Sequence, residues 1–108
     1  MKHTIQFLNP TWHYGTNVTV RLGDKWNKNA EIGDSIKLVK TCEEGRALVE
    51  GTVTKKIYCR FMDLPVEVLA LEHDRECAFL GGLVIAMLRS YPEFNHESMV
   101  TAIYFEIK

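Results

Sequence analysis

The sequence predicts an α+β fold, a small β-barrel of five to six strands with one or two flanking helices. Three observations lead to this prediction. Short segments with the two-residue alternation of strands fill most of residues 3–61. Helical periodicity follows within residues 63–91, and residues 98–107 alternate again. Because closure of a sheet removes its exposed edges, we expect the last strand to close a barrel.

Two strands are expected at the start of the chain. The first covers residues 3–9 and ends at Pro10, because proline donates no ladder hydrogen bond. The second covers residues 16–22, where valine and leucine at every second position alternate with Asn, Thr and Arg. The segment 24–34 is polar and rich in turn residues, so we expect a loop there.

The next two strands form a hairpin. Residues 35–41 alternate as the third strand, and residues 42–46 form the connecting loop. Residues 47–61 are a long fourth strand, in which Gly51 indicates a bulge or a bend.

The period changes after Asp63, which we expect to cap a short helix over residues 66–72. A second, more apolar helix is expected around residues 78–88 and ends before Pro92. Its apolar stripe is predicted to be core. In the last strand, residues 98–107, both faces carry apolar side chains.

The whole chain is predicted to form a single domain, residues 1–108. The net charge of −1 argues against a strongly basic nucleic-acid binder. The charge is uneven, however, since residues 1–60 carry ten Lys or Arg against six Asp or Glu, and residues 61–108 carry three against eight. This asymmetry is typical of a protein with one basic and one acidic face.

The sequence predicts neither a membrane segment nor a cofactor. The longest apolar run, residues 78–88, is shorter than the ~20 residues that span a bilayer. The three cysteines are widely spaced and form no CxxC pair, so we expect reduced thiols, no metal site and a cytoplasmic protein.

The strongest candidate site lies at the end of the second strand and just after it, where a tryptophan stands among three basic residues: Arg21, Lys25, Trp26 and Lys28. The preceding loop adds further rings: Trp12, His13 and Tyr14. Cations can bind phosphate while aromatic rings stack on bases, which is how single-stranded RNA is often bound. The alternative is that Trp26 belongs to the core or rim and that the lysines are solvated.

A second candidate is the cluster Glu72, His73, Asp74 and Glu76. Carboxylates beside a histidine could serve as acid-base groups or metal ligands. No second His or Cys lies at metal-ligand spacing, however, and Asp74 as a helix cap with Glu76 at the helix N-terminus explains the cluster equally well.

Three blocks of the sequence resemble the ASCH domain family of small PUA-like β-barrels: GTNVTVRLGDKW, AEIGDSIKLV, and LEHDRECAFLGGLVIAMLRSYPEF with VTAIYFEI. The order of these blocks is most similar to that of small ASCH-like proteins encoded by phages and prophages. The resemblance implies binding of RNA or a nucleotide in a cleft beside strand 16–22.

One bacterial member of that family is an amidohydrolase that deacetylates acetylcytidine. Its motif, approximately Gly-x-Lys-x-x-(Glu/Thr)-x-Arg, aligns with Thr19 and Arg21 here, and its helix glutamate aligns best with Glu76. The lysine position, however, holds Thr16, which cannot supply a positive charge. Lys25 could replace that cation only if its loop folds back.

We therefore predict binding without catalysis, through six residues: Thr16, Thr19, Arg21, Lys25, Trp26 and Lys28. One alternative is a hydrolase of a modified nucleoside or of RNA that uses Thr19 and Glu76. Another is a phage or prophage factor whose acidic second half docks on a basic host protein.

Overall fold

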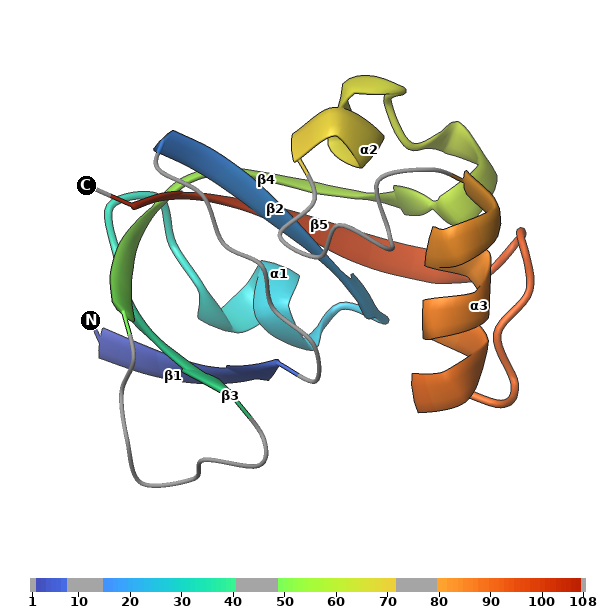
Figure 1. Cartoon of the computed structure of the whole chain (residues 1–108), viewed down its shortest axis with the longest axis horizontal. Coiled ribbons are helices and arrows are strands. Elements are labelled where there is room, and N and C mark those ends of the chain that lie inside the picture. The colour runs from blue at the N-terminus through green and yellow to red at the C-terminus, as the bar shows by residue number, and fades with distance from the viewer. Residues whose placement is uncertain (1, 8–14, 41–48, 72–79, 108) are drawn as a thin grey trace.

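The computed structural model describes residues 2–7, 15–40, 49–71 and 80–107 (Figure 1). These ranges hold five strands: β1 (Lys2–Phe7), β2 (Gly15–Leu22), β3 (Ser35–Lys40), β4 (Val49–Arg60) and β5 (Met99–Ile107). They also hold three α-helices: α1 (Lys25–Asn29), α2 (Glu67–Leu71) and α3 (Leu80–Ser90). One 3-10 turn, Phe61–Asp63, follows β4. The five predicted strands are confirmed within a few residues at each end.

The strands form one mixed sheet in the order β1-β3-β4-β5-β2. Strand β1 pairs with β3 in parallel, and the other pairs are antiparallel. Within the described strands no pairing joins β1 to β2, so the sheet is curled and has two edges, where the sequence predicted a closed barrel. Helix α1 lies between those edges (Figure 1). Residues of β1, β2 and α1 line a cavity there.

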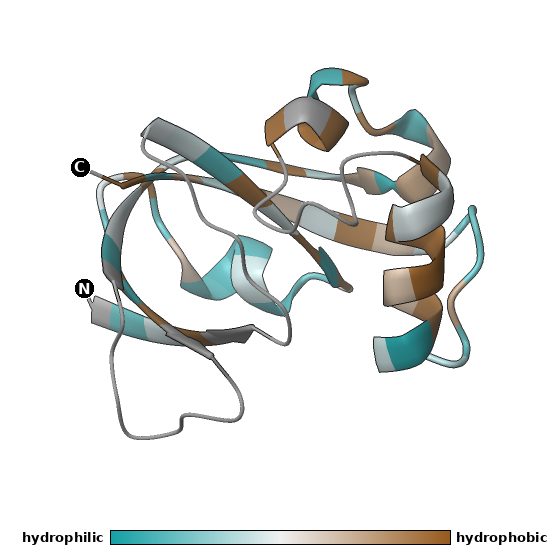
Figure 2. Ribbon diagram, viewed as in Figure 1, coloured by the Kyte–Doolittle hydropathy of each residue, from teal (hydrophilic) through white to brown (hydrophobic). Residues whose placement is uncertain are grey.

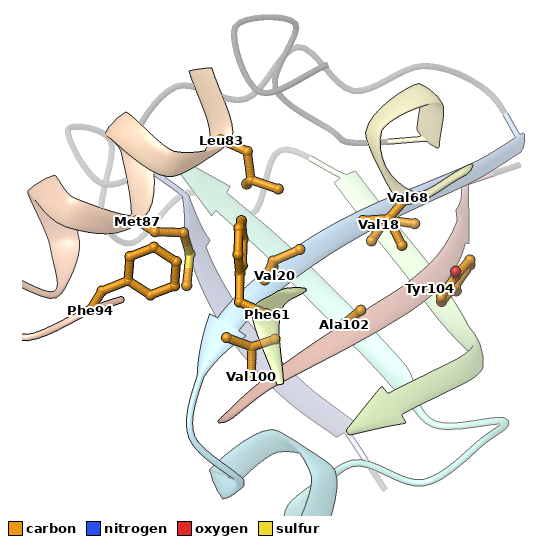
Figure 3. Close-up of a cluster of buried hydrophobic side chains, with 10 residues drawn as sticks. All are labelled: Val18, Val20, Phe61, Val68, Leu83, Met87, Phe94, Val100, Ala102 and Tyr104. Carbon is orange, nitrogen blue, oxygen red and sulfur yellow. The ribbon is translucent and has the colours of Figure 1, made fainter. Parts of the chain in front are cut away.

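Strand β5 does not close the sheet, because it lies between β4 and β2. Its two faces carry two separate cores, whereas the sequence predicted only that both faces of this strand carry apolar side chains. Val100, Ala102 and Tyr104 face α2 and α3 in a cluster that we call the outer core (Figure 3). The remaining members of that core are Val18, Val20, Phe61, Val68, Leu83, Met87 and Phe94.

The opposite face of β5 builds the inner core, inside the curve of the sheet. Its buried members come from four strands: Ile5, Ile36, Leu38, Val53, Ile103, Phe105 and Ile107. Trp26 of α1 packs against this cluster. The inner core therefore supports the element that carries part of the candidate site.

Strand β4 lies between β3 and β5 and pairs with both. Residues 49–52 pair with β3 and residues 52–60 pair with β5, so Thr52 pairs with both strands. The register shifts between Val53 and Lys55, so a bulge forms at Thr54, three residues beyond the Gly51 where the sequence predicted it. Gly51 has another reason to be glycine, because a Cβ there would lie 3.1 Å from Cδ2 of Phe105.

The helices match the sequence less closely than the strands do. Helix α2 begins at Glu67 and agrees with the prediction. Asp63 does not cap it, because this residue ends the 3-10 turn and its carboxylate accepts a 2.9 Å hydrogen bond from Arg60 Nε. In α3 only the stripe around Leu83 and Met87 is buried.

Helix α1 was not predicted at all. Its five residues are mostly hydrophilic and none is fully buried (Figure 2). Figure 1 shows it inside the curve of the sheet, where it contacts β4 and β5.

Candidate functional site

The side chains of β2 divide between the two cores. Val18 and Val20 point into the outer core. Because side chains alternate along a strand, Thr19 and Arg21 point to the inner side, whereas Thr16 shares the outer side with the valines. The structure thus brings Thr19 and Arg21 together and does not bring Thr16 to them. The hydroxyl of Thr19 accepts a 3.0 Å hydrogen bond from Arg21 Nε.

A tight connection leads from β2 to α1. Gly23 takes a φ of +78°, a left-handed value that glycine adopts readily. Its amide donates to the carbonyl oxygen of Met99 (2.8 Å), and its own carbonyl accepts from Thr101 Oγ1 (2.7 Å). These two bonds to β5 fix the direction in which α1 leaves the sheet.

The far end of α1 is held by β4. The Lys56 ammonium donates to the carbonyl oxygens of Asn27 (2.6 Å) and Ala30 (2.7 Å). These are carbonyls at the C-terminal end of the helix, where a cation is favourable. Helix α1 is therefore fastened to the sheet at both ends.

A cavity of about 570 Å³ lies between the edge strands, beside α1. Its lining residues come from four parts of the chain: Thr4 and Ile5 of β1, Arg21 and Leu22 of β2, Lys25 and Trp26 of α1, and Tyr91 after α3. Three of the six predicted binding residues, Arg21, Lys25 and Trp26, therefore meet at one cavity.

Cations and rings face this cavity together. The Lys25 ammonium lies 5.5 Å from the centroid of the Trp26 ring, within the range of a cation-π interaction. Arg21 adds a guanidinium that is orientated by Thr19. Tyr91 contributes a second aromatic ring to the lining. The arrangement can bind an anion and a flat ring at the same time.

A part-buried hydrogen bond between His3 of β1 and Asp34 supports Trp26. The His3 ring meets the Trp26 ring edge to face, with centroids 5.9 Å apart. Asp34 Oδ2 accepts hydrogen bonds from the amide of Glu31 (3.0 Å) and from His3 Nε2 (2.7 Å). These two hydrogen bonds lower the pKa of Asp34 to about 2, and the bond from the Glu31 amide has the larger effect. Asp34 is therefore an ionised acceptor, so His3 Nε2 carries the proton.

Lys28 lies apart from the cavity lining. Its ammonium pairs with Asp24 one turn earlier at 2.9 Å, and its side chain is 73% exposed. Their hydrogen bond raises the pKa of Lys28 and lowers that of Asp24.

Two groups of predicted residues lie outside the described ranges. They are the aromatic loop residues Trp12, His13 and Tyr14, and the acidic cluster Glu72, His73, Asp74 and Glu76. The catalytic role predicted for Glu76 stays a prediction.

Sequence reasoning missed several residues around the cavity: His3, Asp34, Lys56, Tyr91 and Thr101. Each acts through a partner more than 20 residues away or lines the cavity from a distant element. No local motif marks any of them.

The described residues hold no group of three or more His, Cys, Asp or Glu that could bind a metal ion. Among the same residues, Cys59 is a free thiol, and burial raises its pKa. None of the described helices is both long and apolar enough to cross a membrane.

No protein-family model matches the sequence, and no curated protein matches it. Two solved structures are similar to it in fold. A hypothetical protein, PH0355, matches with a TM-score of 0.56 and 17% identity over the full length of both chains. The ASCH domain from Lactobacillus crispatus JV V101 matches with a TM-score of 0.70 and 10% identity, over 98% of this chain and 79% of that one. The chain therefore has the fold of an ASCH domain.

Proposed function

We propose that this protein is an ASCH-type domain that binds single-stranded RNA or a nucleotide in the cavity between β1 and β2. The observation that carries the proposal is the meeting of Arg21, Lys25 and Trp26 at one cavity, although they come from a strand and from a separate helix.

The lining supports a ligand that is both anionic and aromatic. Arg21 and Lys25 supply positive charge for phosphate oxygens, and Arg can bind phosphate through two parallel hydrogen bonds. Trp26 and Tyr91 offer rings on which a base can stack, at about 1–3 kcal/mol per base. A cavity of about 570 Å³ lies within the range of small-molecule sites, roughly 300–1,000 Å³.

The geometry around Thr19 supports binding without catalysis. Thr19 is only 1% exposed, and its hydroxyl accepts a hydrogen bond from Arg21. Thr16, which stands at the position of the lysine in amidohydrolases that this sequence resembles, lies on the opposite side of β2. We assign Thr19 to the orientation of Arg21.

The test is a titration of a short single-stranded RNA and of a nucleoside monophosphate against four proteins: wild type, Arg21→Gln, Lys25→Met and Lys28→Met. The matched control is Lys28→Met, because Lys28 lies on the same helix outside the cavity lining. Thermal unfolding of each variant checks that the fold is intact.

We expect Arg21→Gln to weaken binding by about tenfold or more, since a hydrogen bond to a charged group contributes roughly 1.5–3 kcal/mol. Lys25→Met should weaken it less, and Lys28→Met should change it by less than about twofold. Equal affinities of wild type and Arg21→Gln would remove this cavity as the site. Failure of wild type to bind either ligand would refute the proposed function.

A further inference from the structure

Two neighbouring lysines of β4, Lys55 and Lys56, point to opposite faces of the sheet because side chains alternate along a strand, and the bulge at Thr54 decides which lysine faces which side. Val53 pairs with Phe105, and Lys55 pairs with the next residue of β5, so Thr54 is extra. Lys55 therefore lies on the outer side, with its ammonium 5.1 Å from the Tyr104 ring centroid.

Lys56 pairs with Ile103 of the inner core and points to the inner side, where its side chain is only 20% exposed. There it donates to the carbonyls of Asn27 and Ala30, at 2.6 and 2.7 Å. The carboxylate of Glu31 lies 3.8 Å from the same ammonium. Lys56 does not line the cavity.

Helix α1 depends on contacts of this kind for its position. It has five residues, none of them fully buried, and helices this short are not stable by themselves in water. At its start it is tied to β5 through Gly23. At its end the only side-chain donor to its carbonyls among the described residues is Lys56.

We infer that Lys56 is a positioning residue of the binding site, which holds α1 so that Lys25 and Trp26 face Arg21 across the cavity. The inference rests on the proposed function, since it assigns a role within the same site. Arg21 belongs to β2 and keeps its place without α1. Loss of Lys56 should therefore separate the two walls of the site and leave the sheet intact.

The experiment compares Lys56→Met with Lys55→Met. Each substitution removes one positive charge, and the two residues are adjacent in β4. The substitutions differ in the face of the sheet that loses the charge. Two readouts are used: affinity for a nucleoside monophosphate, and two NMR measures of α1, namely the contact between the His3 and Trp26 rings and the hydrogen exchange of the Ala30 amide. Ala30 is fully buried, and its amide donates to the carbonyl of Trp26.

We expect Lys56→Met to weaken the His3–Trp26 contact and to speed exchange at Ala30, while amides of β5 stay protected. If α1 then keeps its place for one-tenth of the time, the apparent Kd rises about tenfold. The two readouts should change together. Lys55→Met should change neither, and Lys56→Arg, which retains a charged donor, should restore part of both.

Wild-type values of both readouts in Lys56→Met would overturn the inference. Equal loss of protection in α1 and in β5, in Lys56→Met and also in the milder Lys56→Gln, would overturn it too, because Lys56 would then act on global stability. If the wild type binds neither single-stranded RNA nor a nucleotide, the proposed function fails, and the NMR measures of α1 alone decide whether Lys56 positions the helix.

Discussion

The two cores on either side of β5 differ in what surrounds them. The outer core is lined by aliphatic and aromatic side chains from the sheet, α2 and α3 (Figure 3). Its one buried polar atom without a partner, among the described residues, is the Tyr104 hydroxyl, and burial raises the pKa of that group. The four buried polar residues of the described ranges all lie on the inner side: Asn17, Thr19, Asp34 and Thr101.

From this difference we expect the outer core to contribute mainly to stability, and the polar groups of the inner side to contribute mainly to the proposed site. Burial of apolar area dominates the outer face, where polar groups are few. The inner face carries hydrogen-bonded polar groups that hold Arg21, α1 and Trp26 in place around the cavity. Substitutions on the outer face should therefore change the free energy of unfolding, whereas polar substitutions on the inner face should change the site.

The largest expected effect is on the outer face. Phe61 is 6% exposed and packs edge to face against Phe94 at 4.8 Å, so Phe61→Ala should lower the free energy of unfolding by about 3–5 kcal/mol. Urea denaturation measures the change. The control is Met62→Ala, because Met62 is 56% exposed. Nucleotide affinity of the folded protein should stay within about twofold of wild type, and a greater loss would show that the two faces are coupled.

An intermediate effect is expected from salt. Arg21 and Lys25 are the two cations of the cavity lining, so RNA binding should neutralise about two phosphates. The slope of log K against log salt should then be about −1.4, from roughly −0.7 per phosphate on single strands. Arg21→Gln should reduce it by about half, and Lys28→Met should not change it. A slope near −4 would place most phosphate contacts outside this cavity.

The smallest expected effect is a pH dependence of stability from Asp34. Its pKa is about 2 in the folded protein and near 3.8 when unperturbed, so the folded state favours the ionised form. Its contribution to stability is present above pH 3.8 and is lost as the pH falls towards 2. Urea midpoints of wild type and Asp34→Asn should therefore differ at pH 6 and converge near pH 2. A difference that is independent of pH would contradict this assignment.

The strands could be predicted because each one places apolar residues on a buried face at every second position. The open sheet was not predicted, because strand patterns do not show which strands pair, and the sequence does not indicate α1, which lies between β1 and β2 (Figure 1). The two asparagines in residues 24–29 disfavour a helix, and the helix is held by Thr101 and Lys56, which are remote in the sequence.

The grouping of residues at the cavity was predictable where those residues are local in the sequence. Arg21, Lys25 and Trp26 lie within six positions and share a plausible chemistry, so the sequence alone could group them. Tyr91 and His3 reach the same region only through the fold. Lys28 belongs to the same local group by sequence, but its ion pair with Asp24 lies outside the cavity lining.

The central place of β5 also sets the order in which the protein can assemble during synthesis. Strand β2, which carries Arg21, pairs within the described strands only with β5, a partner about 80 residues later in the chain. While a ribosome is still making residues 99–107, β2 therefore lacks this partner and α1 lacks its tie to Thr101. Among the described strands, the pairing of β1 with β3 and of β3 with the start of β4 can form earlier. The cavity that we propose as the binding site is thus a late product of folding, completed after β5 has left the ribosome.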